Sequence, residues 1–374
     1  MMQSQTLDKS LKAPRVDYLD MLKCLGMFIV VSGHIHPQFG WFSLSVHCFV
    51  IPLYFFLSGM TFKRSKYPTL REFIKHRFKT LLIPYLMFSV VTWAFWAFFN
   101  VISHTQEDLW GPLFQTVLAQ GSGGFFVHNA PLWFLPCLFI VEVLYYLIDK
   151  LPEWANILVC ILLSVIGACM ISWWKGPFVL LPWSIESAFV AILFYCAGNL
   201  LVKHLGLVGI QDKVLGKKWL SLIIMVLLTL VMINAAHWNG RISLGSDTLG
   251  KFPLLFYLNA FIGIITSSLF AILICSIKRD NKLINAVMNY HLWFGRNSLY
   301  IMATHVPIKG IIIVGISKLI GESTGFVKDD WWCMAIVFVL TCAICSLLSL
   351  WIGKWKKKDE QRMEKWRLAR TANK

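Results

Sequence analysis

The stretch KWLSLIIMVLLTLVMINAAH, residues 218–237, is a run of twenty residues in which apolar side chains dominate. A helix needs about 20 such residues to cross the ~30 Å hydrocarbon core of a bilayer. Lipid gives backbone polar groups no water partner, so a run of this kind crosses the membrane as an α-helix. The stretch therefore predicts a transmembrane helix.

Comparable runs recur from one end of the chain to the other. The 374 residues are 57% hydrophobic and only 14% charged, whereas a soluble domain carries about a quarter charged residues. The composition predicts an all-α, polytopic integral membrane protein with about ten transmembrane helices, and it excludes an ordinary soluble enzyme. The predicted helices span residues 17–36, 45–62, 80–100, 131–149, 155–174, 178–202, 218–237, 252–277, 297–320 and 332–353.

The basic residues predict the orientation of these helices. If ten helices alternate and the chain starts inside, 29 of the 35 Lys and Arg residues fall on the cytoplasmic side. Cytoplasmic loops carry such an excess, so we expect the N-terminus and the C-terminus to be cytoplasmic. The expected organisation is a cytoplasmic segment at 1–15, a transmembrane domain at 16–353 and a basic cytoplasmic tail at 354–374. The tail would lie on anionic lipid headgroups.

The cysteines and histidines give little support to a metal or a disulfide framework. Ten cysteines are irregularly spaced, and the close pair Cys342 and Cys345 lies inside the last predicted helix, where packing explains it. The pair His34 and His36 lacks the further ligands at defined spacing that zinc requires. We expect no metal, no tightly bound cofactor and no nucleic-acid partner.

The first predicted helix carries a cation and an imidazole on one face. In KCLGMFIVVSGH, Lys23 and His34 are eleven positions apart, which is about three helical turns and roughly 16 Å of rise. This spacing makes them candidates for one functional site. Asp20 lies three residues before Lys23, so an ion pair between the two is an alternative explanation for the lysine.

Other ionisable residues in predicted spans are candidates because such groups are costly in lipid. His47 opens the second helix and would meet His34 at similar depth, unless it is only a helix-end histidine. Glu142 and His305 could support catalysis, because a buried carboxylate or imidazole can orient a base or act as one. A structural hydrogen-bonding role is the alternative for each, as it is for Glu186 and Lys309.

A basic segment follows the second predicted helix. KRSKYPTLREFIKHRFKTLLIPY, residues 63–85, holds seven Lys or Arg residues and one acidic residue. Arginine binds phosphate through a planar fork, so a nucleotide or coenzyme A would be matched here. The orientation of the membrane helices alone also accounts for part of this charge.

Six segments, taken in order, carry a resemblance to a known family: RVDYLDMLKCLGMFIVVSGH, VHCFVIPLYFFLSG, FIKHRFKTLLIPY, PLWFLPCLF, LPWSIESAFVAILFYCAG and NSLYIMATHVPI. They resemble the membrane acyltransferase-3 family over residues 15–350, and they are most similar to its fucose 4-O-acetylase-like branch. The most specific element is a basic residue, ten residues and a histidine, here Lys23 to His34.

The resemblance implies an O-acyltransferase in the inner membrane of a bacterium. Such enzymes move an acyl group, usually acetyl, from cytoplasmic acyl-coenzyme A to a sugar hydroxyl of an extracytoplasmic or lipid-linked glycan. The matching catalytic residues are His34 and Lys23, the latter an arginine in many relatives. The family's Arg-x-x-Arg matches at Arg77, whereas its fourth position is Thr80, with Lys79 beside it. Donor binding is therefore expected at Lys23, Arg77 and Lys79.

The resemblance leaves several properties open. Acetyl-coenzyme A is the expected cosubstrate, a carbohydrate or glycolipid is the expected acceptor, and neither the acceptor hydroxyl nor the oligomeric state is predicted. Ten helices with intramembrane charges also suit a transporter or flippase for a glycan or an acyl intermediate. Against that alternative, no two corresponding Gly- or Pro-broken helices mark inverted repeats.

Overall fold

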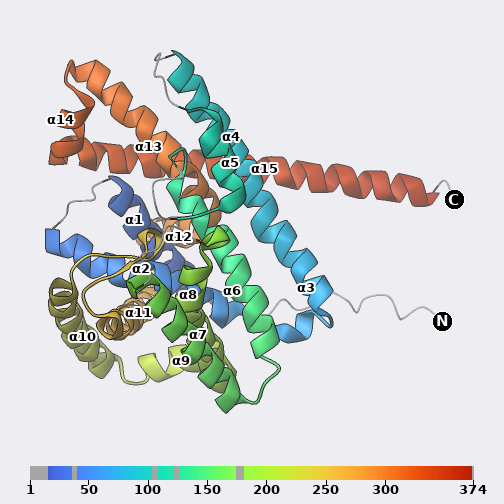
Figure 1. The fold of residues 1–374 in the computed structure, drawn as a ribbon, viewed down its shortest axis with the longest axis vertical. Coiled ribbons are helices and arrows are strands. Elements are labelled where there is room, and N and C mark those ends of the chain that lie inside the picture. Colours follow the sequence, from blue (N-terminus) through green and yellow to red (C-terminus); the bar gives the residue numbers. More distant parts are fainter. Residues whose placement is uncertain (1–15, 36–39, 103–107, 122–126, 174–180, 373–374) are drawn as a thin grey trace.

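The computed structural model describes residues 16–35, 40–102, 108–121, 127–173 and 181–372. Within these residues, ten helices are long and apolar enough to cross a membrane, which confirms the predicted all-α, ten-helix class (Figure 1). The predicted segment 1–15 and His36 lie outside the described residues. The ten spans are Asp17–Ile35, Ser43–Thr61, Leu70–Ile102, Ala130–Ile148, Glu153–Trp173, Pro182–Leu205, Lys218–Asn239, Pro253–Cys275, Ser298–Ile320 and Trp331–Trp355.

The spans correspond to helices that shorter elements connect. The long helices are α1 (Asp17–Ile35), α2 (Gly40–Thr61), α4 (Ile83–Ile102), α6 (Phe134–Ile148), α7 (Glu153–Trp173), α8 (Ile185–Leu205), α10 (Lys218–Asn239), α11 (Pro253–Cys275), α13 (Ser298–Ile320) and α15 (Trp331–Ala372). The shorter helices are η1 (Arg64–Lys66), α3 (Leu70–Arg77), η2 (Phe78–Leu82), α5 (Trp110–Leu118), η3 (Ala130–Trp133), η4 (Pro182–Ser184), α9 (Leu207–Leu215), η5 (Leu244–Ser246), α12 (Lys282–Arg296) and α14 (Thr324–Asp329). Two short antiparallel strands, β1 (Ile242–Ser243) and β2 (Thr248–Leu249), pair Ile242 with Leu249.

The third span starts ten residues earlier than the predicted 80–100. Thr69 caps α3 by accepting a hydrogen bond from the backbone amide of Glu72, as N-cap threonines do. Phe73 anchors α3 by being fully buried. Arg71 and Lys75 lie exposed on this helix, whereas Arg77 is partly buried. Long cationic side chains can extend to the polar boundary.

A π-helical turn, η2, joins α3 to α4. The amide of Ile83 donates to the carbonyl of Phe78, five residues earlier. Proline cannot donate to a helix ladder, and Pro84 is the second residue of α4. Turns of this kind occur mostly as local bulges, often at functional sites, and this one carries Leu81 into the wall of the cavity described below.

The core forms where α1 and α2 pack against each other and against α8, α11 and α13. Close helix approach depends on small residues, which let backbones touch in a membrane protein. A Cβ at Gly59 of α2 would overlap the carbonyl of Tyr195 in α8, and one at Gly198 of α8 would overlap the carbonyl of Phe56. These two glycines therefore set the contact between α2 and α8.

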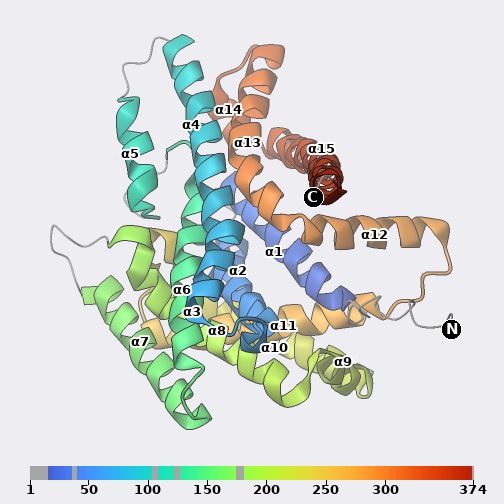
Figure 2. The same cartoon turned by 90° about the vertical axis from the view of Figure 1, so that its right-hand side faces the viewer.

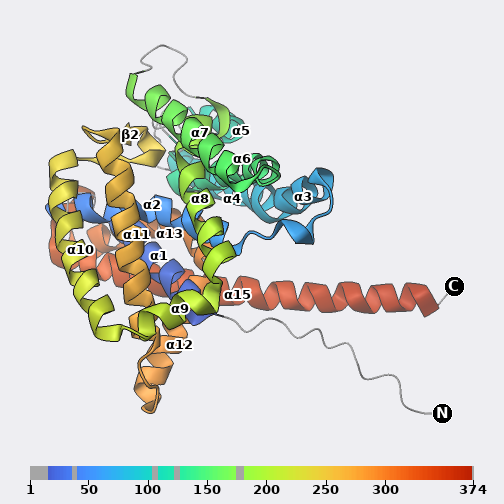
Figure 3. The same ribbon diagram turned by 90° about the horizontal axis from the view of Figure 1, so that it is seen from below.

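Two helices extend beyond the bundle. α15 continues as one 42-residue helix from Trp331 to Ala372, so the backbone of the predicted tail 354–374 is helical through Ala372. Figure 3 shows α15 projecting toward the side on which α3 lies. Figure 2 shows α12 leaving the base of α13, with its N-terminal half projecting from the bundle, while its C-terminal half packs on α1.

Candidate active site

One cavity of about 310 Å³ joins the predicted residues of the first helix. Lys23, Met27, Val30 and His34 of α1 all line it. Their spacing of four, three and four residues keeps them on one helix face, so the predicted shared face of Lys23 and His34 is confirmed. The remaining lining residues come from α2, α3, η2, η3, α6 and α13: Ile51, Tyr54, Leu57, Ser58, Thr61, Arg77, Leu81, Pro131, Trp133, Phe134, Leu135, Leu138, Glu142, Ser298, Leu299 and Met302.

At one end of this cavity, the imidazole of His34 lies beside that of His305. The two ring centroids are 5.1 Å apart and the rings are tilted by 54°. His305 is fully buried on α13. One turn further along the same helix, the ammonium of Lys309 donates a hydrogen bond to the backbone carbonyl of His34 at 2.9 Å. α13 therefore presents both an imidazole and a cation to the end of α1.

The hydrogen bonds of His305 fix which ring nitrogen carries its hydrogen. Nδ1 lies 2.8 Å from the carbonyl oxygen of Met302 and 3.1 Å from that of Ile301. A carbonyl only accepts, so Nδ1 is the donor, and Nε2 is the acceptor of the neutral ring. Nε2 is buried and has no hydrogen-bond partner among the described residues. A lone pair is thus available next to His34.

Asn129 fixes the turn of α13 that carries His305. Pro307 lies inside α13 and cannot donate to the carbonyl four residues earlier, which belongs to Ala303. The side-chain amide of Asn129 donates to that carbonyl at 2.7 Å. Asn129 is not among the site residues predicted from the sequence, although a proline inside a predicted span signals a carbonyl that needs a partner.

His47 does not line the cavity; its ring lies against Gly33, the residue before His34. Its Nδ1 lies 2.7 Å from the backbone carbonyl of Ser43 and 3.0 Å from the hydroxyl of the same residue. On the other side of the ring, a Cβ at Gly33 would overlap Nε2. His47 therefore contacts the residue before His34, and Gly33 is the position that allows this approach.

The other end of the cavity holds an ion pair. Nε of Arg77 lies 2.8 Å from Oε2 of Glu142, with the two side chains 20% and 3% exposed. Glu142 was predicted either to support catalysis or to have a structural role, and the structure pairs it with Arg77. Lys79 and Thr80 are exposed, and Thr80 donates to the carbonyl of His76 at 3.1 Å. Of the predicted donor residues, Lys23 and Arg77 line the cavity.

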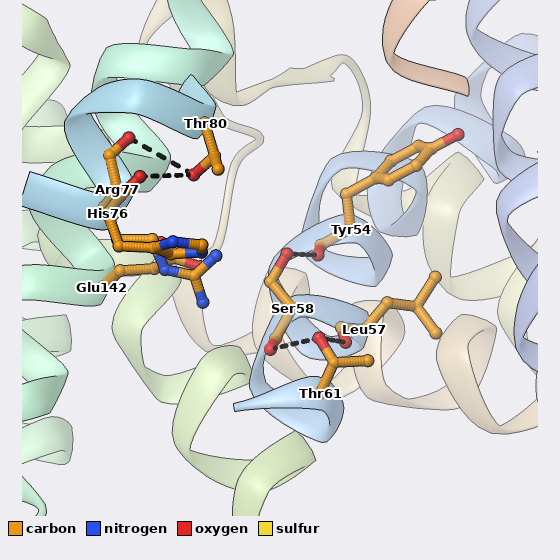
Figure 4. Close-up of polar contacts among 8 residues, drawn as sticks. All are labelled: Tyr54, Leu57, Ser58, Thr61, His76, Arg77, Thr80 and Glu142. Carbon is orange, nitrogen blue, oxygen red and sulfur yellow. Dashed lines mark hydrogen bonds and ion pairs between the residues drawn. The ribbon is translucent and has the colours of Figure 1, made fainter. Parts of the chain in front are cut away.

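Hydroxyl groups of α2 line the wall between the two ends. Tyr54 donates to the backbone carbonyl of Lys23 at 2.9 Å, which ties α2 to α1. Ser58 donates to the carbonyl of Tyr54 at 2.8 Å, and Thr61 donates to that of Ser58 at 3.0 Å. Figure 4 shows Ser58 and Thr61 across from Arg77 and Glu142.

The acidic residues at the start of α1 pair with arginines. Asp20 contacts Nε of Arg296 in α12 at 3.0 Å, and Asp17 contacts Arg279 at 2.8 Å. Carboxylates also suit a helix N-terminus, where the backbone dipole favours negative charge. These pairs connect the beginning of α1 to the end of α12 and to the segment that precedes α12.

The described residues contain no group of three or more His, Cys, Asp or Glu side chains that could hold a metal ion. All ten cysteines are free. Cys342 and Cys345 are buried on α15, and Cys345 accepts a hydrogen bond from Thr304 of α13 at 3.5 Å. This contact is helix packing, as the sequence indicated.

The sequence profile of the acyltransferase-3 family, which describes an acyltransferase domain, matches residues 16–350. The chain belongs to this family. The match covers nine of the ten spans completely and most of the tenth, so the helical bundle is the acyltransferase domain. A search of curated proteins and a search of solved structures each give no significant match. The protein is thus a multi-span membrane acyltransferase, with His34 and Lys23 lining its cavity.

Proposed function

We propose that this acyltransferase moves an acyl group, most often acetyl, from acyl-coenzyme A to a sugar hydroxyl of a glycan or glycolipid. The observation that carries the proposal is one cavity with cations at one end and an imidazole at the other. Lys23 and Arg77 supply the cations, and His34 supplies the imidazole. A donor with phosphates at one end and a thioester at the other matches this polarity.

The cationic end suits the phosphates of the donor. Arginine forms charge-assisted, bidentate bonds with phosphate oxygens, and lysine adds a compact positive charge. The eleven residues from Lys23 to His34 correspond to roughly 16 Å of helix. Apolar side chains such as Met27, Val30 and Leu138 line the passage. A slender pantetheine arm would fit this passage and carry the thioester toward His34.

The imidazole end suits transfer to a hydroxyl. A neutral imidazole of His34 takes the proton of the sugar hydroxyl while its oxygen attacks the thioester carbonyl. A C–O bond forms, the C–S bond breaks, and the coenzyme A thiolate leaves and takes the proton from His34. In a variant of this route, His34 carries the acyl group itself before the hydroxyl accepts it.

His305 is proposed to orient His34 for this role. Its Nε2 is a buried acceptor beside the His34 ring. If it accepts the N–H of His34, the other ring nitrogen of His34 is left as the base that faces the cavity. Lys309 would fix the backbone of the same residue through its bond to the His34 carbonyl.

The proposal places the protein in the inner membrane of a bacterium, as the family resemblance implies. The distribution of Lys and Arg supports an orientation with Lys23 and Arg77 toward the cytoplasm. The donor would then enter from the cytoplasm, and the acceptor would meet His34 near the outer side. The fucose 4-O-acetylase-like branch is part of this proposal, with a carbohydrate or glycolipid as acceptor. No nucleic acid, metal or tightly bound cofactor takes part in it.

To test the proposal, acetyl-coenzyme A with a labelled acetyl group is added to membranes that contain the protein. The expected result is release of free thiol together with label in glycan, in an ester that mild alkali cleaves. Wild-type membranes that release thiol no faster than empty membranes, across several acyl donors and glycans, would contradict it. Movement of glycan across the membrane without ester formation would support the flippase alternative.

A further inference from the structure

The ion pair between Arg77 and Glu142 joins two elements that meet at the cationic end of the cavity. Arg77 ends α3 and Glu142 lies in the middle of α6, and both line the cavity. Nε of the arginine is 2.8 Å from Oε2 of the glutamate. The glutamate is almost completely buried, with 3% of its side chain exposed. The inference below rests on the proposed function.

A buried carboxylate needs a partner, because removing a charge from water is costly unless a nearby charge and hydrogen bonds compensate. Arg77 supplies that partner. The guanidinium carbon of Arg77 also lies 5.4 Å from the centre of the Phe73 ring. Phe73 in turn stacks on Tyr146 of α6, with ring centroids 4.7 Å apart. The guanidinium is therefore held between an aromatic ring and a carboxylate.

The geometry leaves part of the guanidinium available for a ligand. Arginine has five N–H donors in a fixed planar fork. Nε lies against Oε2 of Glu142, and neither atom has a hydrogen-bond partner among the described residues, so the pair is held by charge. The edge formed by the two terminal nitrogens can bind two oxygens of a phosphate. Figure 4 shows the guanidinium of Arg77 beside Glu142 and across from Ser58 and Thr61 of α2.

We propose that Glu142 is a positioning residue for the acyl donor. It holds Nε of Arg77 and thereby points the two terminal nitrogens into the cavity, where they bind a phosphate of coenzyme A. Glu142 does not contact the reacting atoms, which lie at the His34 end. It is also not a base for the transfer step, because its carboxylate is engaged by the guanidinium.

A purely structural role is the alternative, in which the pair only ties α3 to α6. The two roles differ in what a conservative substitution changes. In Glu142→Gln, the amide keeps the size of the side chain, but the charge that orients the arginine is lost. A structural tie predicts lower thermal stability with unchanged donor affinity, whereas a positioning role predicts weaker donor affinity.

The test measures binding of coenzyme A to the purified, detergent-solubilised protein by calorimetry, together with acyl-transfer kinetics. Glu142→Gln is expected to weaken coenzyme A binding about tenfold, because the ion pair that holds Arg77 in place is lost. The KM for the donor should rise by a similar factor, and kcat at saturating donor should stay within about twofold of wild type. The matched control is Glu153→Gln, because Glu153 pairs with His204 on the surface.

A double-mutant cycle ties the effect to Arg77. Arg77→Ala is expected to weaken coenzyme A binding at least as much as Glu142→Gln does. The double variant should bind coenzyme A as tightly as Arg77→Ala alone, since the two residues act as a unit. Glu142→Asp provides a second variant that keeps the charge but moves it back by one methylene. It should also weaken binding, to a smaller extent.

The outcomes separate the inference from the proposed function. If the wild type does not bind coenzyme A, the proposed donor is wrong and so is this inference. If the wild type binds and both Glu142 variants bind as tightly, the proposed function stands and the positioning role is wrong. If Glu142→Gln and Arg77→Ala weaken binding additively, the two residues act separately, which also overturns the inference.

Discussion

The ammonium of Lys309 donates a hydrogen bond to the backbone carbonyl of His34, at 2.9 Å. His34 is in the last turn of α1, where helix carbonyls lack partners within the helix. A cation there also interacts favourably with the helix dipole. This bond connects the end of α1 to α13 and holds the backbone of the proposed base.

Lys309→Met should therefore lower both stability and turnover. We expect a loss of about 1 kcal/mol in the free energy of unfolding, and a lower kcat with unchanged affinity for coenzyme A. Thermal melting in detergent and transfer kinetics measure the two effects. Lys318→Met is the control, because Lys318 is exposed on the same helix. Equal kcat values in both variants would contradict the role of Lys309.

His305→Ala should reduce kcat about 100-fold, because a base that is not held in place loses catalytic effect when it moves by an ångström. Coenzyme A binding should not change, since His305 lies at the opposite end of the cavity from Arg77. Calorimetry and single-turnover transfer assays separate these quantities. The control is His204→Gln, an exposed histidine that pairs with Glu153. A His305→Ala enzyme with wild-type kcat would show that His34 needs no orienting imidazole.

Asn129→Ala should destabilise the protein by about 1 to 3 kcal/mol, the usual cost of an unsatisfied buried acceptor. The acceptor is the carbonyl of Ala303, which Pro307 leaves without a helical donor. In a Pro307→Ala background the alanine amide can donate to that carbonyl, so Asn129→Ala should cost much less. Thermal melting of the four proteins gives the result. Equal costs in both backgrounds would refute this explanation of Asn129.

His128 makes stability depend on pH. Burial lowers the pKa of His128 from 6.5 to about 4, so the folded protein binds fewer protons there than the unfolded chain between pH 4 and 6.5. Stability is complete above pH 6.5 and falls as the pH drops toward 4, with a loss of about 2 kcal/mol at pH 5. Melting at pH 7.5 and pH 5 should show a smaller difference for His128→Gln than for the wild type. An identical pH response in the two proteins would contradict the assignment.

The number of helices and the face of α1 could be predicted from sequence because both depend on local pattern. Apolar runs of membrane length give the spans, and the eleven-residue spacing places Lys23 and His34 on one face of a helix. The start of the third span could not be located in the same way. The predicted span began at residue 80, but Thr69 caps a helix that starts at Leu70, and Phe73 is buried on it.

The contacts across helices could not be predicted from one sequence. Glu142 contacts Arg77, which is 65 residues away in the chain, and Asp20 contacts Arg296, which is 276 residues away. Periodicity shows which face a residue occupies, but the rotation and depth of each helix follow from packing against its neighbours. Lys79, predicted to bind the donor, lies exposed on η2, whereas Arg77 at the end of α3 lines the cavity.

The central claim is that one cavity separates a donor-binding end from a chemistry end. The most direct test compares acetyl-coenzyme A binding and labelled acetyl transfer in wild type, His34→Ala and Lys23→Ala. We predict that His34→Ala binds the donor with wild-type affinity and transfers no label. Lys23→Ala should bind about tenfold more weakly and still transfer label at saturating donor. Transfer by His34→Ala at the wild-type rate would contradict the account.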